Sequence, residues 1–158
     1  MRLRAMVRFL RRLRLKIATG GKLHAGSNVY FGAGAVIKSP EFATFGDDVA
    51  VGRDFHVEAN LRVGSGVLIS SRVAIVGNDH QFDADDAVYW SGRLPASTVT
   101  IEGDVLIGFG AIIVGDVTIH RGCIVGAGSV VTRDLPPDTV CVGAPAAPIR
   151  MRERGAQS

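Results

Sequence analysis

The sequence has few aromatic residues, few cysteines and no long apolar segment. Phe, Trp and Tyr make up 6% of its 158 residues, and there are two cysteines, too few for the disulfide framework of a small secreted domain. We expect neither a membrane-spanning helix, which needs about 20 apolar residues, nor a secretory signal, because residues 1–22 contain no uninterrupted apolar stretch. The chain is 47% hydrophobic, which predicts one folded domain. Its 20 glycines and many Val and Ile residues argue against a helical bundle.

The net charge of +3 is unevenly distributed along the chain. Residues 1–22 contain eight basic residues and no acidic one, whereas the rest has ten basic and fifteen acidic residues. A basic nucleic-acid-binding surface is therefore not expected. Within the basic segment Leu3, Met6, Leu10, Leu13 and Ile17 recur at helical spacing. This amphipathic helix either caps an open end of the fold or, because it is Arg-rich, binds a membrane surface through residues 1–17.

A six-residue repeat organises the remaining chain. Fifteen hexads begin with an apolar residue, twelve of them with Val or Ile: Ala25, Phe31, Ile37, Phe45, Val51, Val57, Val63, Ile69, Ile75, Ile101, Ile107, Ile113, Ile119, Val125 and Val131. The second position is often Gly. A β-sandwich would not keep one phase of six, whereas a period of six lets short strands repeat their in–out alternation on successive faces. We therefore expect triangular coils of eighteen residues, with glycine at tight corners.

The coil length predicts three interior stacks. Val63, Ile101 and Ile119 form one, Val51, Ile69, Ile107 and Val125 the second, and Val57, Ile75, Ile113 and Val131 the third. Two breaks interrupt the phase. Two extra residues lie near Ser39–Glu41, and residues 81–100 form a long loop after the hexad that ends at His80. Long loops on repetitive scaffolds commonly carry function, so we expect the chemistry here.

The hexads, the segment "VGNDHQFD" and the run from "IEGDVLIGFG" to "VCVGAPAAPIR" resemble the hexapeptide-repeat acyltransferases over residues 23–150. The similarity is greatest to the branch of maltose, galactoside, xenobiotic and surface-polysaccharide O-acetyltransferases. The resemblance implies an all-β, left-handed parallel β-helix of about five coils. The expected organisation is a basic helical extension (1–22), the β-helix domain (23–149) and a C-terminal tail (150–158).

The resemblance also implies acetyl transfer from acetyl-CoA, with His80 as the general base. A neutral imidazole accepts a proton near neutral pH. Asp83 or Asp79 orients the imidazole or contacts substrate, and Asn78, Asp79 and Trp90 are expected in the acceptor site. Tyr89 and Trp90 either stack on a sugar ring or lie at a subunit interface.

Cofactor-binding residues are implied by position in the same family. Gly108 and Phe109 fall beside the thioester, Gly126 and Ala127 beside the pantetheine arm, and Thr132, Arg133 and Arg150 beside the nucleotide and its phosphates, which arginine binds well. The glycines also satisfy corner geometry. Leu106 and Ala147 depart from the residues common in the branch. The asparagine of the galactoside branch has only weak counterparts, Asn60 and Glu58.

A metal site is not expected. The γ-class carbonic anhydrases share this fold and bind zinc through three histidines, but this chain has no His-x(4)-His spacing. Cys123 and Cys141 are one coil apart if the phase holds, and we expect reduced, packed thiols. The resulting hypothesis is a cytoplasmic, homotrimeric O-acetyltransferase acting on a sugar or surface-polysaccharide precursor. A xenobiotic acetyltransferase and a non-catalytic β-helix scaffold are the alternatives.

Overall fold

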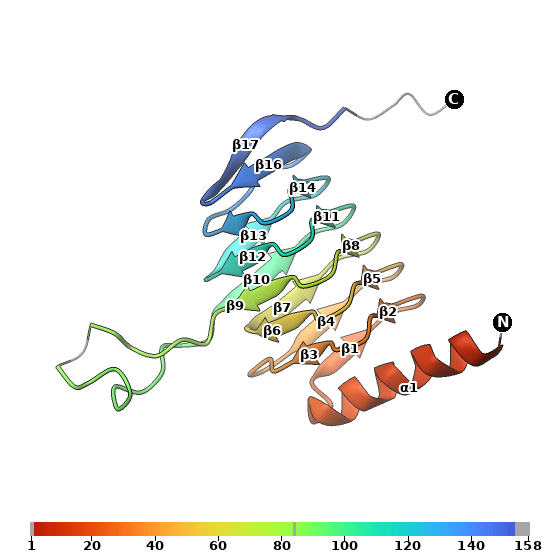
Figure 1. The fold of residues 1–158 in the computed structure, drawn as a ribbon, viewed down its shortest axis with the longest axis horizontal. Coiled ribbons are helices and arrows are strands. Elements are labelled where there is room, and N and C mark those ends of the chain that lie inside the picture. The colour runs from red at the N-terminus through yellow and green to blue at the C-terminus, as the bar shows by residue number, and fades with distance from the viewer. Residues whose placement is uncertain (1, 84, 154–158) are drawn as a thin grey trace.

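The computed structural model describes residues 2–83 and 85–153 as a parallel β-helix with one helix at its N-terminal end (Figure 1). The chain passes through three sheets in turn, called here sheets 1, 2 and 3. Sheet 1 contains β1 (Leu23–Ala25), β4 (Ala43–Phe45), β7 (Asn60–Val63), β10 (Thr98–Ile101) and β13 (Val117–Ile119). Sheet 2 contains β2 (Tyr30–Phe31), β5 (Ala50–Val51), β8 (Leu68–Ile69), β11 (Leu106–Ile107), β14 (Ile124–Val125), β16 (Thr139–Gly143) and β17 (Ala146–Met151). Sheet 3 contains β3 (Val36–Ile37), β6 (His56–Glu58), β9 (Ala74–Val76), β12 (Ile112–Val114) and β15 (Val130–Val131).

The three predicted interior stacks are confirmed. Ile101 pairs with Val63 below and Ile119 above, Ile107 with Ile69 and Val125, and Ile113 with Ile75 and Val131. All of these side chains are buried. The β-helix class is as predicted, although sheet 2 exceeds the expected five coils because β16 adds a sixth parallel strand and β17 an antiparallel one.

The coils are not all eighteen residues long. Phe31 pairs with Val51, twenty residues on, which accommodates the two extra residues near Ser39–Glu41. Near the C-terminal end Val125 pairs with Cys141, only sixteen residues on. The expected stacking of Cys123 under Cys141 is therefore wrong in register, because the last coil is two residues shorter. The two sulfur atoms are nevertheless 3.9 Å apart.

Two kinds of corner position favour glycine, for different reasons. A Cβ atom on Gly108 would lie 2.5 Å from the backbone nitrogen of Ala127 in the next coil. At this second hexad position the stacked corners are too close for any side chain, and φ is not positive. Two residues later Gly110 has φ +68° with open space around it. The expected left-handed conformation thus occurs at the fourth position of the hexad, not at the second.

The two ends of the stack are covered by different structures (Figure 1). At the C-terminal end β17 folds back on β16, and Nη1 of Arg152 donates to the backbone oxygens of Asp104 and Gly122. At the N-terminal end α1 (Arg2–Ala18) lies across the first coil and contacts β1, β2 and β3. The helix is present as predicted, and it occupies the capping position.

Candidate active site

The long loop leaves sheet 3 after β9 and returns to sheet 1 at β10, so it spans 77–97 (Figure 1). It ends earlier than the predicted residue 100, because Val99 is buried between Leu61 and Val117 in the ladder. A short antiparallel arrangement closes its base. The backbones of His80 and Arg93 form an isolated antiparallel β-bridge, and the Leu94 N–H donates to the backbone oxygen of Asp79 at 2.8 Å.

The base of the loop places His80 where a substrate can reach it. Its side chain is half-buried, and its backbone position is fixed from both sides, since the Gln81 N–H donates to the Gly92 oxygen at 3.1 Å. Within residues 2–83 and 85–153 no hydrogen bond or ion pair joins the imidazole to Asp79 or Asp83. Asp83 is exposed and lines a small hollow with Gln81, Phe82 and Leu94. Asn78 contributes its backbone oxygen, which accepts a hydrogen bond from Arg93.

The outer part of the loop is solvent-exposed and carries aromatic and aliphatic side chains together with Asp83, Asp85 and Asp86. Tyr89 and Trp90 meet edge to face with ring centroids 4.6 Å apart, and 77% of the Trp90 surface is accessible. Phe82 and Val88 are exposed as well. A surface of this kind is suited either to stacking on a ligand or to burial against another subunit.

The first predicted cofactor residues lie at the corner between sheets 2 and 3. Gly108 and Phe109 follow β11, and Gly126 and Ala127 follow β14 directly above them. Phe109 is half-exposed and lines a groove of about 380 Å³ along sheet 2. The Arg72 guanidinium lies 5.6 Å from its ring centroid, a contact that the hexad pattern does not signal.

At this corner the backbone N–H groups of neighbouring residues differ in whether they have a hydrogen-bond acceptor. The Gly108 and Gly126 N–H groups donate to the Val125 and Cys141 oxygens, each at 2.8 Å. In contrast, the N–H groups of Phe109 and Ala127 donate to no atom of the described chain. These two N–H groups, and not those of the glycines, are available to a ligand.

The remaining cofactor residues lie elsewhere. Thr132 and Arg133 are exposed and follow β15, so they lie at the corner between sheets 3 and 1, the same edge as His80. Two coil spacings separate them from β9, roughly 10 Å at about 4.8 Å per coil. Arg150 lies on β17 at the C-terminal end, where its Nη1 donates to the Met151 oxygen at 3.0 Å.

Sheet 3 therefore separates the predicted base from the predicted thioester corner. The six residues from Ile107 to Ile113 span one side of the prism, at most about 20 Å for extended chain. Within one chain, His80 thus belongs to the edge between sheets 3 and 1 that also carries Thr132 and Arg133, whereas Phe109 and Ala127 lie at the opposite edge of sheet 3.

The weak counterparts of the galactoside-branch asparagine have other contacts. Asn60 is buried, and its Oδ1 accepts the Glu41 N–H at 3.0 Å, which holds the two-residue insertion. Glu58 is ion-paired with Lys38 at 2.9 Å and with His56 at 3.1 Å. The hydrogen bond from Lys38, followed by that from His56, lowers the pKa of Glu58 below its ordinary value.

Neither cysteine shows the features of a reactive or metal-bound thiol. Both are buried and free, and burial raises the pKa of Cys123 to about 12, with a further contribution from Cys141. Among residues 2–83 and 85–153 no group of three His, Cys, Asp or Glu side chains is placed to hold a metal ion.

Comparison with known proteins shows which proteins the chain is similar to. Residues 98–133 match the bacterial transferase hexapeptide model of six repeats. The galactoside O-acetyltransferase of Escherichia coli (strain K12) is 31% identical over 127 residues, which are 75% of this chain and 62% of that protein. The chain is therefore similar to the hexapeptide-repeat transferases, in its repeat and over most of its length. It spans somewhat less than two thirds of that curated relative.

Solved structures of the family have the same fold. A hexapeptide-repeat acetyltransferase from Vibrio cholerae, complexed with acetyl coenzyme A, is 27% identical, with a TM-score of 0.73 over 91% of this chain and 77% of that one. A maltose O-acetyltransferase from Clostridium difficile 630 is 29% identical, with a TM-score of 0.57 over 84% of this chain and 67% of that one.

Proposed function

We propose that the protein transfers an acetyl group from acetyl-CoA to a hydroxyl group, with His80 as the general base. The observation that carries the proposal is the position of His80, half-buried at the closed base of the only long loop in the described chain. Similarity to an O-acetyltransferase and to an acetyl-CoA complex supports the reaction class.

His80 acts in one direct transfer. Its neutral imidazole accepts the proton of the acceptor hydroxyl while that oxygen attacks the thioester carbonyl. The C–S bond then breaks, the acetyl ester is released, and the proton passes from the imidazolium to the CoA sulfur. The unpartnered N–H groups of Phe109 and Ala127 are the donors we assign to the developing oxyanion. Asp79 or Asp83 positions the imidazole when substrate and a second subunit are present.

The active site lies between subunits of a homotrimer. One chain separates His80 from the Phe109 corner by a full side of the prism, and a ring of three copies brings the His80 edge of one copy to the Phe109 corner of the next. The exposed Tyr89 and Trp90 are then available to the neighbouring copy or the acceptor. Arg133 and Arg150 bind the CoA phosphates, and Asn78, Asp79 and Trp90 contact the acceptor.

The acceptor we propose is a sugar or a surface-polysaccharide precursor, modified in the cytoplasm, where acetyl-CoA is made. The similarity to galactoside and maltose O-acetyltransferases favours a sugar over a xenobiotic. A library of sugars, glycan precursors and antibiotics, with CoA release as the signal, identifies the acceptor. No CoA release with any acceptor would favour the scaffold alternative.

Substitution of His80 tests the mechanism. His80→Ala should lower acetyl transfer by about 10²-fold or more, as for loss of a general base, while the circular dichroism spectrum and thermal midpoint stay near wild type. His24→Ala is the matched control, because His24 is exposed on β1, far from the loop. A His80→Ala variant with wild-type turnover would exclude His80 as the base. A monomer mass by light scattering, with activity intact, would exclude the intersubunit site.

A further inference from the structure

α1 contacts the first coil mainly through basic side chains. An apolar stripe would ordinarily be the face that packs against the β-helix. Leu15 is the only large apolar residue buried at this contact among the described side chains, and around it the helix presents arginines to the coil. Arg12 donates to the Ala25 oxygen, Arg11 Nη1 donates to the Tyr30 hydroxyl at 3.4 Å, and Arg8 lies 4.9 Å from the Tyr30 ring centroid. These contacts fix which face of α1 is covered.

The apolar face of α1 consequently points away from the β-helix. Its described members share one side of the helix, since each lies three or four residues from another member, and their exposed fractions run from 42% to 71%: Met6, Phe9, Leu10, Leu13 and Ile17. This set is called the outer stripe. Aliphatic and aromatic side chains arranged in one stripe on an exposed helix indicate a surface that is covered by something else.

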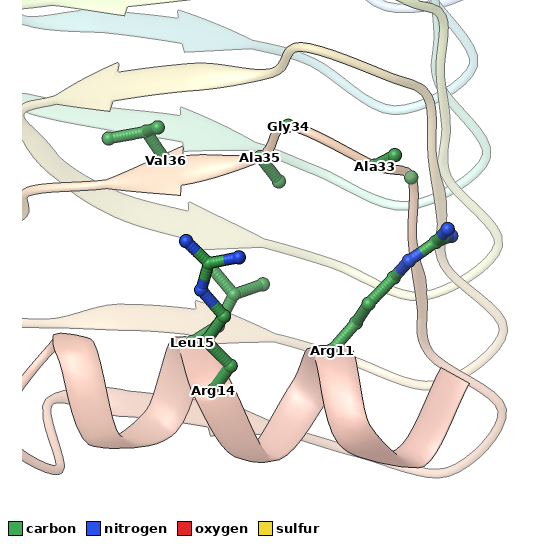
Figure 2. A pocket seen from close by; sticks show the side chains of 8 residues that line it. Arg11, Arg14, Leu15, Ala33, Gly34, Ala35 and Val36 are labelled. Atoms are coloured by element: carbon green, nitrogen blue, oxygen red, sulfur yellow. The ribbon is translucent and has the colours of Figure 1, made fainter. Parts of the chain in front are cut away.

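Arginines lie beside the outer stripe. A hollow of about 210 Å³ between α1 and residues 32–36 is lined by Arg11 and Arg14, which both extend from the helix toward the first coil (Figure 2). Neither guanidinium has a carboxylate within ion-pair distance among the described residues. Lys16 is exposed at the edge of the stripe.

The charge of α1 distinguishes between possible partners. The sequence from Arg2 to Lys16 contains seven basic residues and no acidic one. Two copies meeting through their outer stripes would bring fourteen positive charges together with no counter-charge. A surface of anionic phospholipid matches both the apolar stripe and the positive charge. Its acyl region accepts the stripe, and its phosphates pair with Arg14 and Lys16, which are exposed on either side of the stripe.

We propose that α1 attaches the protein to an anionic phospholipid bilayer by lying flat in the interface, with the outer stripe inserted. No helix in the described chain is long and apolar enough to cross a bilayer. The inference is independent of the proposed acetyl transfer. Because α1 lies across the end of the stack, the coils would stand on the membrane with the opposite β16–β17 end away from it (Figure 1).

Vesicle sedimentation of the full chain tests the proposal. Wild type should bind vesicles of phosphatidylglycerol and phosphatidylcholine, bind pure phosphatidylcholine much less, and dissociate as salt is raised. The double substitution Leu10→Glu and Leu13→Glu should lower the partition coefficient at least tenfold. Arg14→Gln with Lys16→Gln should lower it roughly 25-fold, at about fivefold for each basic residue.

A matched control separates insertion from a general effect of acidic substitution. Ile149→Glu changes an apolar residue that is even more exposed than Leu10 and Leu13, 61% accessible, at the other end of the stack, and this variant should bind vesicles like wild type. The thermal midpoints should be similar, since these side chains are exposed. Equal binding to both vesicle types, or undiminished binding by the Leu10/Leu13 variant, would overturn the proposal. So would a change in the lipid-free mass of that variant, which would assign the outer stripe to an interface between copies.

Discussion

The stack of coils and the loop 77–97 differ in how their residues are packed and hydrogen-bonded. In the stack each interior residue is held from above and below by a residue of the same kind, as Ile107 is by Ile69 and Val125. In the loop the hydrogen bonds gather at the base, around His80 and Arg93, and the tip exposes its aromatic rings. The stack thus contributes stability with little chemical variety, whereas the loop contributes chemical groups with little packing. Two substitution pairs test this contrast, and a third tests a surface interaction of the stack alone.

The largest effect is expected from a core truncation. Ile107→Ala should lower the free energy of unfolding by about 2–5 kcal/mol, because Ile107 is fully buried and its removal leaves a cavity in the stack. The loop counterpart, Val88→Ala, should change it by no more than about 0.5 kcal/mol. Denaturant unfolding at fixed protein concentration measures both. Equal losses would show that the loop is part of the cooperative fold.

A smaller difference is expected between two glycines. In Gly108→Ala the new Cβ would meet the backbone of Ala127, so the coils must separate locally at a cost of roughly 1–3 kcal/mol. In Gly92→Ala the added methyl meets no atom within 4 Å, and φ is +79°. The cost is therefore that of the left-handed backbone conformation alone, about 1–2 kcal/mol, because the Gln81 N–H holds the Gly92 oxygen in place. A larger loss for Gly92→Ala in thermal unfolding would contradict this account of the corners.

The smallest effect concerns an ion-pair cluster on the stack. The pKa of Glu58 is lowered in the folded chain, so the contribution of this group is present at neutral pH and is lost as pH falls below its ordinary value of 4.5. Glu58→Gln should remove a few tenths of a kcal/mol at pH 7, because the side chain is 35% exposed and its partners are screened. As the pH falls below 4.5, the difference in stability between the variant and wild type should shrink. Glu41→Gln is the control, because this exposed glutamate forms no ion pair within residues 2–83 and 85–153.

The stack could be predicted residue by residue because hexad spacing and burial follow the same rule. One apolar position in six determines the register of Val57, Ile75 and Ile113, whatever lies between them. The hexad rule gives the wrong register in the last coil, because that coil is two residues shorter and no residue pattern in the sequence indicates the change. Cys141 lies over Val125 because the turn through Leu135 shortens the last coil, and Leu135 takes the place above Ile119.

The site was less predictable, since it depends on groups that no repeat specifies. The position of His80 at the mouth of the loop followed from the phase break, but its bridge to Arg93 did not. The corner glycines drew attention to Gly108, whereas the unpartnered N–H belongs to Phe109. Similarly, the outer stripe was visible in the spacing of Met6, Leu10 and Leu13. Which face of α1 meets the coil depends on Tyr30 and Ala25, which are distant in sequence.

The length of the loop 77–97 can change during evolution with little effect on the stability of the fold. Val63 and Ile101 are paired across 38 residues, where a plain coil would need 18. Loop-closure entropy grows only with the logarithm of length, so the twenty additional residues cost roughly 0.7 kcal/mol. A segment inserted at this corner can therefore be lengthened, shortened or exchanged at nearly constant stability, so the side chains that it presents can vary while the coils beneath stay unchanged.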